Sequence, residues 1–328
     1  MKAKNVLALF LLSVSLVACS SFTFEMITPA PVTPTFTPWV AGTETALANP
    51  SPWVDETVVA NQNVLPTLPP PTAIPGFDMQ KPTDFSPVLY GGKLYDSEFF
   101  LLLGGVSRDA WLAPDESVAR FSSEVTYSLN TMTQESKYFL WGKAPEFSQT
   151  CKVYTVGTDA GLDEAGFVAV VDGWAVTKRD VGELSADDEF YQQAVLDWLK
   201  AEGVDEPQLG TLQIFRVDIE GDGSDEIFVS ATHLDDSQHT TKAGDYSIVL
   251  MRKVVGNEVV TQLILGDVYD SKEPEITYPR TYSLVNFIDL NQDGVLEVVV
   301  SFLKWEGFGA SVYQIDGQDM KQVLNAGC

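Results

Sequence analysis

The sequence predicts an α+β fold that is predominantly antiparallel β and contains one amphipathic helix. Short apolar runs bounded by Gly, Asn and Asp recur beyond about residue 98, a pattern typical of β-strands. One long stretch, residues 187–202, instead spaces its apolar residues as a helix does. A nine-residue acidic loop occurs twice, each time between two strand candidates. We therefore expect β-hairpin or blade-like repeats in the C-terminal half.

The composition is strongly acidic. The 328 residues include 46 acidic and 20 basic side chains, and the net charge is −26. Residues 87–328 alone hold 40 acidic and 17 basic residues. Such a surface repels phosphate groups, so we expect no nucleic-acid partner and no charge-driven binding to anionic lipid. Only two histidines are present, which disfavours mechanisms that depend on several of them.

Residues 1–18 predict a signal peptide. A basic start, Met1–Lys4, precedes an apolar run at residues 6–17 that is too short for a transmembrane helix. The run ends in the tetrapeptide LVAC, whose last residue is Cys19. This tetrapeptide resembles the lipobox of bacterial lipoproteins. The resemblance implies cleavage before Cys19, lipidation of its thiol, and anchoring by the lipid to the outer face of a bacterial membrane or cell surface.

Residues 19–86 predict the lipidated cysteine followed by a disordered stalk rich in Pro and Thr. Thirteen of the 18 prolines lie between Pro29 and Pro87, and the segment has no apolar periodicity. Proline removes amide donors and favours the extended polyproline II conformation. A stalk of this length would span roughly 45 Å as a flexible coil and roughly 200 Å when fully extended. It would hold the next domain away from the membrane.

Residues 87–210 predict a β-rich part that ends in the helix. Apolar runs predict strands at 125–129, 137–141, 152–156, 167–171 and 174–177, and a short helix at 113–121. The dipeptide Asp172-Gly173 indicates a tight hairpin between the last two of these strands. The helix at 187–202 would begin at an Asp187 cap and end at Gly203.

Residues 211–328 predict a second part that contains the repeated loop. The expected strands are 213–217, 227–232, 246–253, 259–265, 282–289, 296–302 and 310–315. The loop reads DIEGDGSDE at residues 218–226 and DLNQDGVLE at residues 289–297. Both copies fit the pattern D-x-(E/N)-x-D-G-x-x-E, and both start after an apolar strand and run into another.

This pattern of residues favours a hard cation. Side-chain oxygens at positions 1, 3, 5 and 9 and a carbonyl at position 7 give the six or seven oxygens that suit Ca²⁺. Both copies lack the His and Cys that transition metals prefer. An EF-hand begins in the same way, but it needs Glu at position 12 and helical flanks, whereas position 12 here is Val229 or Val300. The alternative is a pair of acidic turns that join strands without an ion.

The loops resemble the calcium loops of FG-GAP and VCBS repeats, which form the blades of integrin-like β-propellers. The resemblance covers residues 211–328 and implies part of a β-propeller with two bound Ca²⁺ ions. The ligands implied for the first loop are Asp218, Glu220, Asp222, the carbonyl of Ser224, and Glu226. Those implied for the second loop are Asp289, Asn291, Asp293, the carbonyl of Val295, and Glu297.

Two cysteines remain if Cys19 is lipidated. They are Cys151 and Cys328, and a pair of cysteines in an exported protein favours a disulfide. Closing so long a loop would stabilise the fold by at most about 5 kcal/mol. The alternative is two unpaired thiols.

These features favour a non-catalytic structural or recognition domain at the cell envelope, with a protein or glycan ligand. No G-x-S-x-G, H-E-x-x-H, P-loop or Rossmann pattern is present. The acids at 187–189 would suit a glycosidase, but acids at a helix start are more simply partners of the helix dipole. The aromatics of the segment 305–308 are candidates for ligand contact or for core packing.

Two alternatives stay open. The first is a glycosidase-like extracytoplasmic hydrolase with paired acids and structural calcium. The second is a solute-binding lipoprotein, which the lack of an alternating β/α pattern disfavours.

Overall fold

The computed structural model describes residues 84–94, 97–108, 110–121, 125–132, 135–158, 166–234, 240–269 and 278–328. The chain divides into two units, Met1–Thr72 and Ala73–Cys328, and all described residues belong to the second. The predicted signal peptide, Cys19 and the stalk as far as residue 83 lie outside the described residues. Of the described helices, none is long and apolar enough to cross a membrane.

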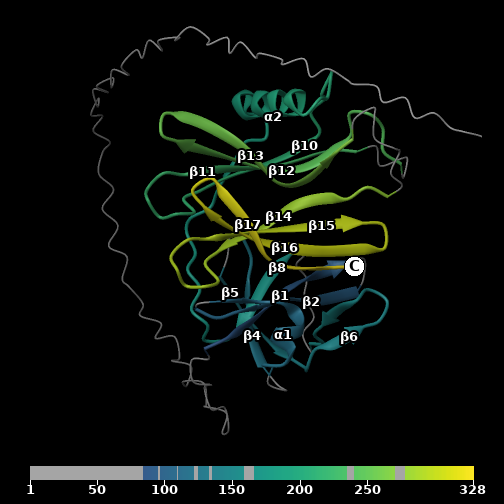
Figure 1. Ribbon diagram of the computed structural model, residues 1–328, viewed down its shortest axis with the longest axis vertical. Coiled ribbons are helices and arrows are strands. Elements are labelled where there is room, and N and C mark those ends of the chain that lie inside the picture. The colour runs from purple at the N-terminus through teal and green to yellow at the C-terminus, as the bar shows by residue number, and fades with distance from the viewer. Residues whose placement is uncertain are drawn as a thin grey trace, which may run out of the picture. The chain divides into compact units, whose positions relative to one another are not determined.

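Three antiparallel sheets make up most of this unit, and Figure 1 shows them as successive layers below helix α2. This arrangement confirms the prediction of a predominantly antiparallel β fold with one amphipathic helix. We call the layers the N-terminal sheet (β1–β8), the first-loop sheet (β9–β13) and the second-loop sheet (β14–β17).

The N-terminal sheet has eight strands in the order β5-β4-β8-β1-β2-β7-β6, with β3 paired to β2. The strands are β1 (Ser86–Leu94), β2 (Ser97–Val106), β3 (Trp111–Leu112), β4 (Val125–Asn130), β5 (Glu135–Gly142), β6 (Glu146–Ser148), β7 (Val153–Thr155) and β8 (Phe167–Val171). The short helix α1 (Pro114–Val118) lies within the segment predicted to be helical. The order of strands is not that of a simple meander, so this region forms a separate sheet and not further four-stranded repeats.

The prediction of a hairpin at Asp172-Gly173, between strands at 167–171 and 174–177, is wrong. The turn is present, and Gly173 has a φ of +83°, but residues 174–176 form no strand in the described structure. Both edges of β8 are already occupied, because β1 pairs on one side and β4 on the other. The chain instead leaves the sheet. Trp174 is buried, and its indole N–H donates to the carbonyl of Leu290 at 2.8 Å.

The first-loop sheet is a meander in the order β13-β12-β11-β10-β9. Its strands are β9 (Gly182–Leu184), β10 (Thr211–Val217), β11 (Glu226–His233), β12 (Tyr246–Val255) and β13 (Glu258–Val268). Helix α2 (Glu189–Ala201) packs on its outer face through Val195 and Leu199, which share a buried cluster with Ile214 and Val229. The predicted boundary near residue 210 therefore separates β9 and α2 from the sheet to which they belong.

Helix α2 has an aspartate cap at its start and a glycine at its end, as the sequence predicts, but the cap lies one residue later than expected. The N-cap is Asp188 and not Asp187, and its carboxylate accepts the N–H of Phe190 at 2.9 Å. At the other end, Gly203 has a φ of +97°. The N–H groups of Gly203 and Val204 donate to the carbonyls of Lys200 and Leu199, respectively, as in a Schellman motif.

The second-loop sheet is a four-stranded meander of β14 (Thr281–Ile288), β15 (Glu297–Lys304), β16 (Gly307–Asp316) and β17 (Asp319–Gly327). It is the central layer and has buried side chains on both faces. Val298 and Val300 join a cluster with Phe228 and Met251 of the first-loop sheet, whereas Val299 joins a cluster with residues of the N-terminal sheet. Burial on both faces explains why β15 reads as a continuous apolar run.

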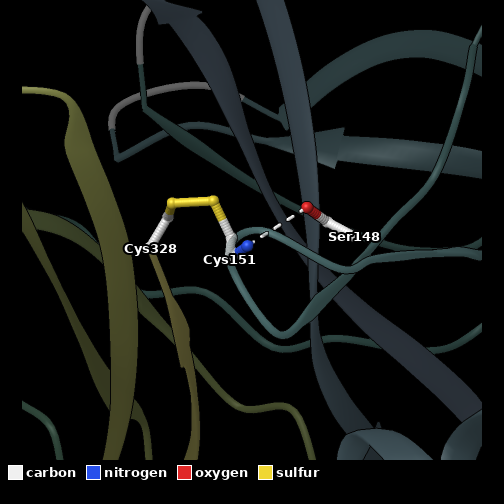
Figure 2. Close-up of a disulfide and its surroundings, with 3 residues drawn as sticks. All are labelled: Ser148, Cys151 and Cys328. Carbon is white, nitrogen blue, oxygen red and sulfur yellow. Dashed lines mark hydrogen bonds between the residues drawn. A yellow bond between two sulfur atoms is a disulfide. The ribbon is translucent and has the colours of Figure 1, made fainter.

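A disulfide joins the second-loop sheet to the N-terminal sheet, as Figure 2 shows. Cys151 lies in the turn between β6 and β7, and Cys328 follows β17. Their Cα atoms are 4.7 Å apart, and the N–H of Cys151 donates to the hydroxyl of Ser148 at 3.3 Å. This is the pairing that the cysteine count predicts, and it closes a loop across 177 residues of sequence.

Candidate metal centres

The two acidic loops occupy equivalent places in the fold. The first connects β10 to β11 and the second connects β14 to β15. Each therefore joins the first two strands of a four-stranded meander, β10–β13 or β14–β17, and β9 adds a fifth strand beside β10. Strand pairing resumes at Val217 opposite Glu226 in one loop and at Ile288 opposite Glu297 in the other. Position 9 of each loop is therefore the first residue of the next strand.

The aspartate at position 1 organises each loop by accepting backbone N–H groups. Asp218 accepts the N–H of Gly221 at 2.6 Å and that of Gly223 at 2.9 Å. Asp289 accepts the N–H of Gln292 at 2.6 Å and that of Gly294 at 3.1 Å. The same two positions, 4 and 6, donate in both loops.

Positions 5 and 9 complete a shared set of hydrogen bonds. The glutamate at position 9 accepts the N–H of position 2, at 3.0 Å from Ile219 to Glu226 and at 2.7 Å from Leu290 to Glu297. The aspartate at position 5 accepts the N–H of position 7 at 2.8 Å in both loops, from Ser224 and from Val295. The predicted residues of each loop thus lie together in one turn.

Two loop positions adopt left-handed backbone. Position 6 is glycine in both copies, with φ of +89° at Gly223 and at Gly294. Position 4 is also left-handed, with φ of +74° at Gly221 and +65° at Gln292. The sequence predicts the glycine at position 6. It does not reveal position 4, because only one copy has glycine there.

The loops differ in burial. Both glutamates at position 9 are buried, with Glu226 2% and Glu297 0% exposed. Asp289 is 2% exposed, whereas its counterpart Asp218 is only half-buried. The Oε1 atom of Glu297 is buried and has no hydrogen-bond partner within the described residues. Burying a carboxylate oxygen without a partner is costly, so this atom is a candidate ligand for a cation.

The pKa directions differ between the loops at position 1 but not at position 9, where burial raises the pKa of Glu226 as well as that of Glu297. Burial raises the pKa of Glu297 to about 8, and the nearby Asp293 and Asp289 add to the effect. Burial also raises the pKa of Asp289. At Asp218, burial acts in the same direction, but three backbone N–H donors and Arg179 outweigh it and lower the pKa. The second loop therefore holds acids whose charge is poorly compensated.

Position 3 makes different contacts in the two loops. Asn291 stays within its own loop, where its side-chain amide donates to Asp293 at 2.8 Å. Glu220 reaches outside its loop to the ammonium of Lys253 on β12, at 2.5 Å, and accepts the N–H of Gly317 at 3.3 Å.

Arg179 ties the two loops together. One guanidinium nitrogen donates to the carbonyls of Asp218 at 2.9 Å and Ile219 at 2.6 Å, and the other donates to the carbonyl of Gly294. The loops also meet directly, since the N–H of Leu296 donates to the carbonyl of Ile219 at 2.8 Å. Sequence reasoning missed Arg179, because nothing in its spacing relates it to either loop.

The donor set of the second loop fits a calcium ion, although the side chains are not drawn together around one point. Among the described residues, His, Cys, Asp and Glu side chains form no group of three or more that could hold a metal ion. The predicted set also uses the amide oxygen of Asn291 and the carbonyl of Val295, and Asp289 is turned toward its own backbone. Calcium binding stays a prediction.

The aromatic residues near the second loop fall into two groups. Phe308 is half-buried, and its ring centroid lies 4.1 Å from that of Phe99, so it packs in the core. Trp305 is 51% exposed and stacks on Tyr278, which is 40% exposed, with ring centroids 5.5 Å apart. Of the two predicted candidates for ligand contact, Trp305 is the exposed one.

Two surface hollows bear on the hydrolase alternative. One, of about 430 Å³, is lined by a single carboxylate, Asp115. The other, of about 280 Å³, is lined mainly by aromatic and small residues and by no carboxylate. The acids at 187–189 lie at the start of α2, where Asp188 is the helix cap. None of these three places supplies the pair of facing carboxylates that glycoside hydrolysis needs.

In comparisons with known proteins, the chain matches no family model, no curated protein and no solved structure.

Proposed function

We propose that this chain is a surface-anchored bacterial lipoprotein whose β-sheet unit is a calcium-stabilised, non-catalytic structural or recognition module at the cell envelope. The observation that carries the calcium proposal is the buried Oε1 atom of Glu297, which has no hydrogen-bond partner in the described part of the chain. It closes a loop that already presents Asp289, Asn291 and Asp293.

In this proposal the second loop would hold the ion through Asp289, Asn291, Asp293, Glu297 and the carbonyl of Val295. Bound calcium would supply the positive charge that the buried carboxylates lack. Strand β14 ends directly before this loop, and β15 begins at its last residue, so the ion would also stabilise the central sheet of the unit.

The arrangement of the two meanders supports the finer proposal of a partial β-propeller. Strands β10–β13 and β14–β17 are consecutive four-stranded meanders with an acidic loop at the same place in each. Their facing sides share one buried cluster, in which the rings of Phe228 and Phe287 have centroids 4.6 Å apart. Adjacent propeller blades pack face to face in this way.

A recognition role has support from the exposed surface. The side chains of Trp305 and Tyr278 stack on each other and are 51% and 40% exposed. Exposed aromatic side chains are common anchors for protein and glycan ligands. The acidic surface, by contrast, disfavours nucleic acid.

Thermal melting tests the calcium proposal. Extracellular calcium modules bind with dissociation constants of about 10⁻⁴–10⁻³ M. At ten times that concentration, one site adds about 1.4 kcal/mol, which is a rise of about 3–6 °C in melting temperature for a domain of this size. We expect this rise in the full-length chain with calcium relative to EDTA, and not with magnesium.

The variant Asp293→Ala should lose this rise, whereas Asp205→Ala, which removes an exposed acid outside the loops, should keep it. Identical melting curves in EDTA, calcium and magnesium would show that the loops are plain acidic turns.

Cell fractionation tests the anchor. The variant Cys19→Ala lacks the thiol that would carry the lipid, so we expect unprocessed or soluble protein where the wild-type chain sediments with membranes. Mass spectrometry of the N-terminal peptide should show acyl chains on the wild-type chain alone. An acylated, membrane-bound Cys19→Ala chain would contradict the lipoprotein assignment.

A further inference from the structure

The two loops differ at one equivalent position on the third strand of each meander. Ile227 pairs with Arg252, so one step further along the register places Glu226 opposite Lys253. In the second loop, Val298 pairs with Tyr313, so the same step places Glu297 opposite Gln314. A cationic side chain faces the first loop, and a neutral amide faces the second.

Lys253 lies among the predicted ligands of the first loop. Its ammonium is 2.5 Å from Oε1 of Glu220 and 3.9 Å from Oε1 of Glu226. The side chain is only 10% exposed, and the buried nitrogen makes ion pairs rather than well-aligned hydrogen bonds. This nitrogen therefore holds a positive charge between positions 3 and 9 of the loop.

Gln314 does not do the same in the second loop. Its side-chain amide donates to Oδ2 of Asp293 at 3.2 Å, and it carries no charge. Oε1 of Glu297 is the counterpart of the Glu226 atom that Lys253 approaches, and it has no hydrogen-bond partner within the described residues. The same ion pair explains why position 3 of the first loop is a glutamate. The side chain of Glu220 is longer than that of Asn291 and reaches Lys253.

We propose that the ammonium of Lys253 takes the place of the metal ion in the first loop, so that the chain binds a single calcium ion, at the second loop. The residue at this position of the third strand would then decide whether a loop is metal-dependent. This inference rests on the proposed calcium function, and it replaces the second ion that the sequence predicts with a side chain of the protein.

Equilibrium dialysis of the full-length chain against radioactive calcium tests the inference. We expect one calcium ion per wild-type chain, two for Lys253→Gln and none for Gln314→Lys. The control Lys200→Gln removes an exposed lysine from helix α2 and should bind one ion. In the wild-type chain, Asp293→Ala should abolish binding, and Asp222→Ala should leave it unchanged.

Melting provides the second readout. Lys253→Gln should melt below the wild-type chain in EDTA and recover in calcium, because calcium would replace the lost ammonium. Gln314→Lys should melt at the same temperature in both. If Lys253→Gln fails to fold even in calcium, the wild-type stoichiometry and Gln314→Lys still decide the question.

The outcomes separate this inference from the proposed function. Two ions in the wild-type chain, one of them lost in Asp222→Ala, would overturn the role of Lys253 and leave calcium stabilisation intact. A folded Lys253→Gln chain that binds no more calcium than the wild type would do the same. No ion in the wild-type chain and one in Lys253→Gln would instead overturn calcium binding at the second loop and support the role of Lys253.

Discussion

The first and second acidic loops share a backbone but differ in their charge compensation. In each loop, the backbone N–H groups of positions 2, 4, 6 and 7 donate to the acids at positions 1, 5 and 9. In the first, Lys253 approaches two of the carboxylates and opposes the effect of burial, which still raises the pKa of Glu226, and the pKa of Asp218 is lowered. In the second, burial raises the pKa values of Asp289 and Glu297. The loop pattern thus specifies a turn, and under our proposal a residue on a neighbouring strand decides whether that turn needs an ion.

The position of each loop in the stack of sheets explains part of this difference. The second-loop sheet lies between the other two sheets, and Asp289 donates its N–H to the carbonyl of Thr177 at 3.0 Å, so the start of the loop is covered. In the first loop, residues 221–225 are exposed. Water can therefore solvate Asp222 of the first loop, whereas both position-9 glutamates, Glu226 and Glu297, are buried.

Removing Arg179 should have the largest effect on this comparison, because its guanidinium contacts both loops. Arg179→Ala removes a charged donor from three loop carbonyls, of which only that of Ile219 keeps a second donor among the described residues, the N–H of Leu296. A hydrogen bond from a charged group contributes about 1.5–3 kcal/mol, and partial exposure reduces the sum, so we expect a loss of about 2 kcal/mol. This corresponds to a fall of about 4–8 °C in melting temperature, measured by circular dichroism in EDTA.

Arg216→Ala is the matched control. Arg216 also lies beside the first loop, but its ion pair with Asp225, at 3.3 Å, joins two side chains that are about half exposed. Such pairs contribute little, so the melting temperature should change by no more than about 2 °C. Equal losses in the two variants would show that the loops do not depend on Arg179 for their link.

Local signals in the sequence predicted much of the fold. All seven strands expected beyond residue 209 are present, because each is an apolar run bounded by turn residues. Helix α2 was predictable from its apolar spacing and from Gly203 at its end. Strand β17 was missed, since only Leu324 in it is fully buried and its apolar pattern is weak.

What the sequence could not predict depends on contacts between distant segments. The hairpin after β8 fails because β4, which precedes it by about 40 residues, occupies the edge that the hairpin needs. In the candidate site, the loop residues share one pattern and were found together, but Arg179 and Lys253 come from other strands or connections. Their relation to the loops exists only once the strands are in register.

The smallest predicted effect concerns loop position 4. Gln292 holds a left-handed backbone with a φ of +65°, where a side chain costs about 1–2 kcal/mol relative to glycine. Gln292→Gly should relieve this strain, and the greater freedom of glycine in the unfolded chain should offset about half of the gain. We expect a net stabilisation of about 0.5 kcal/mol, or about 1–2 °C in melting temperature, in both EDTA and calcium. The reverse change, Gly221→Gln, should destabilise the first loop for two reasons. The left-handed φ would strain a residue with a side chain, and its Cβ atom would clash with the guanidinium of Arg179. A lower melting temperature for Gln292→Gly would mean that contacts of the Gln292 side chain outweigh its backbone strain.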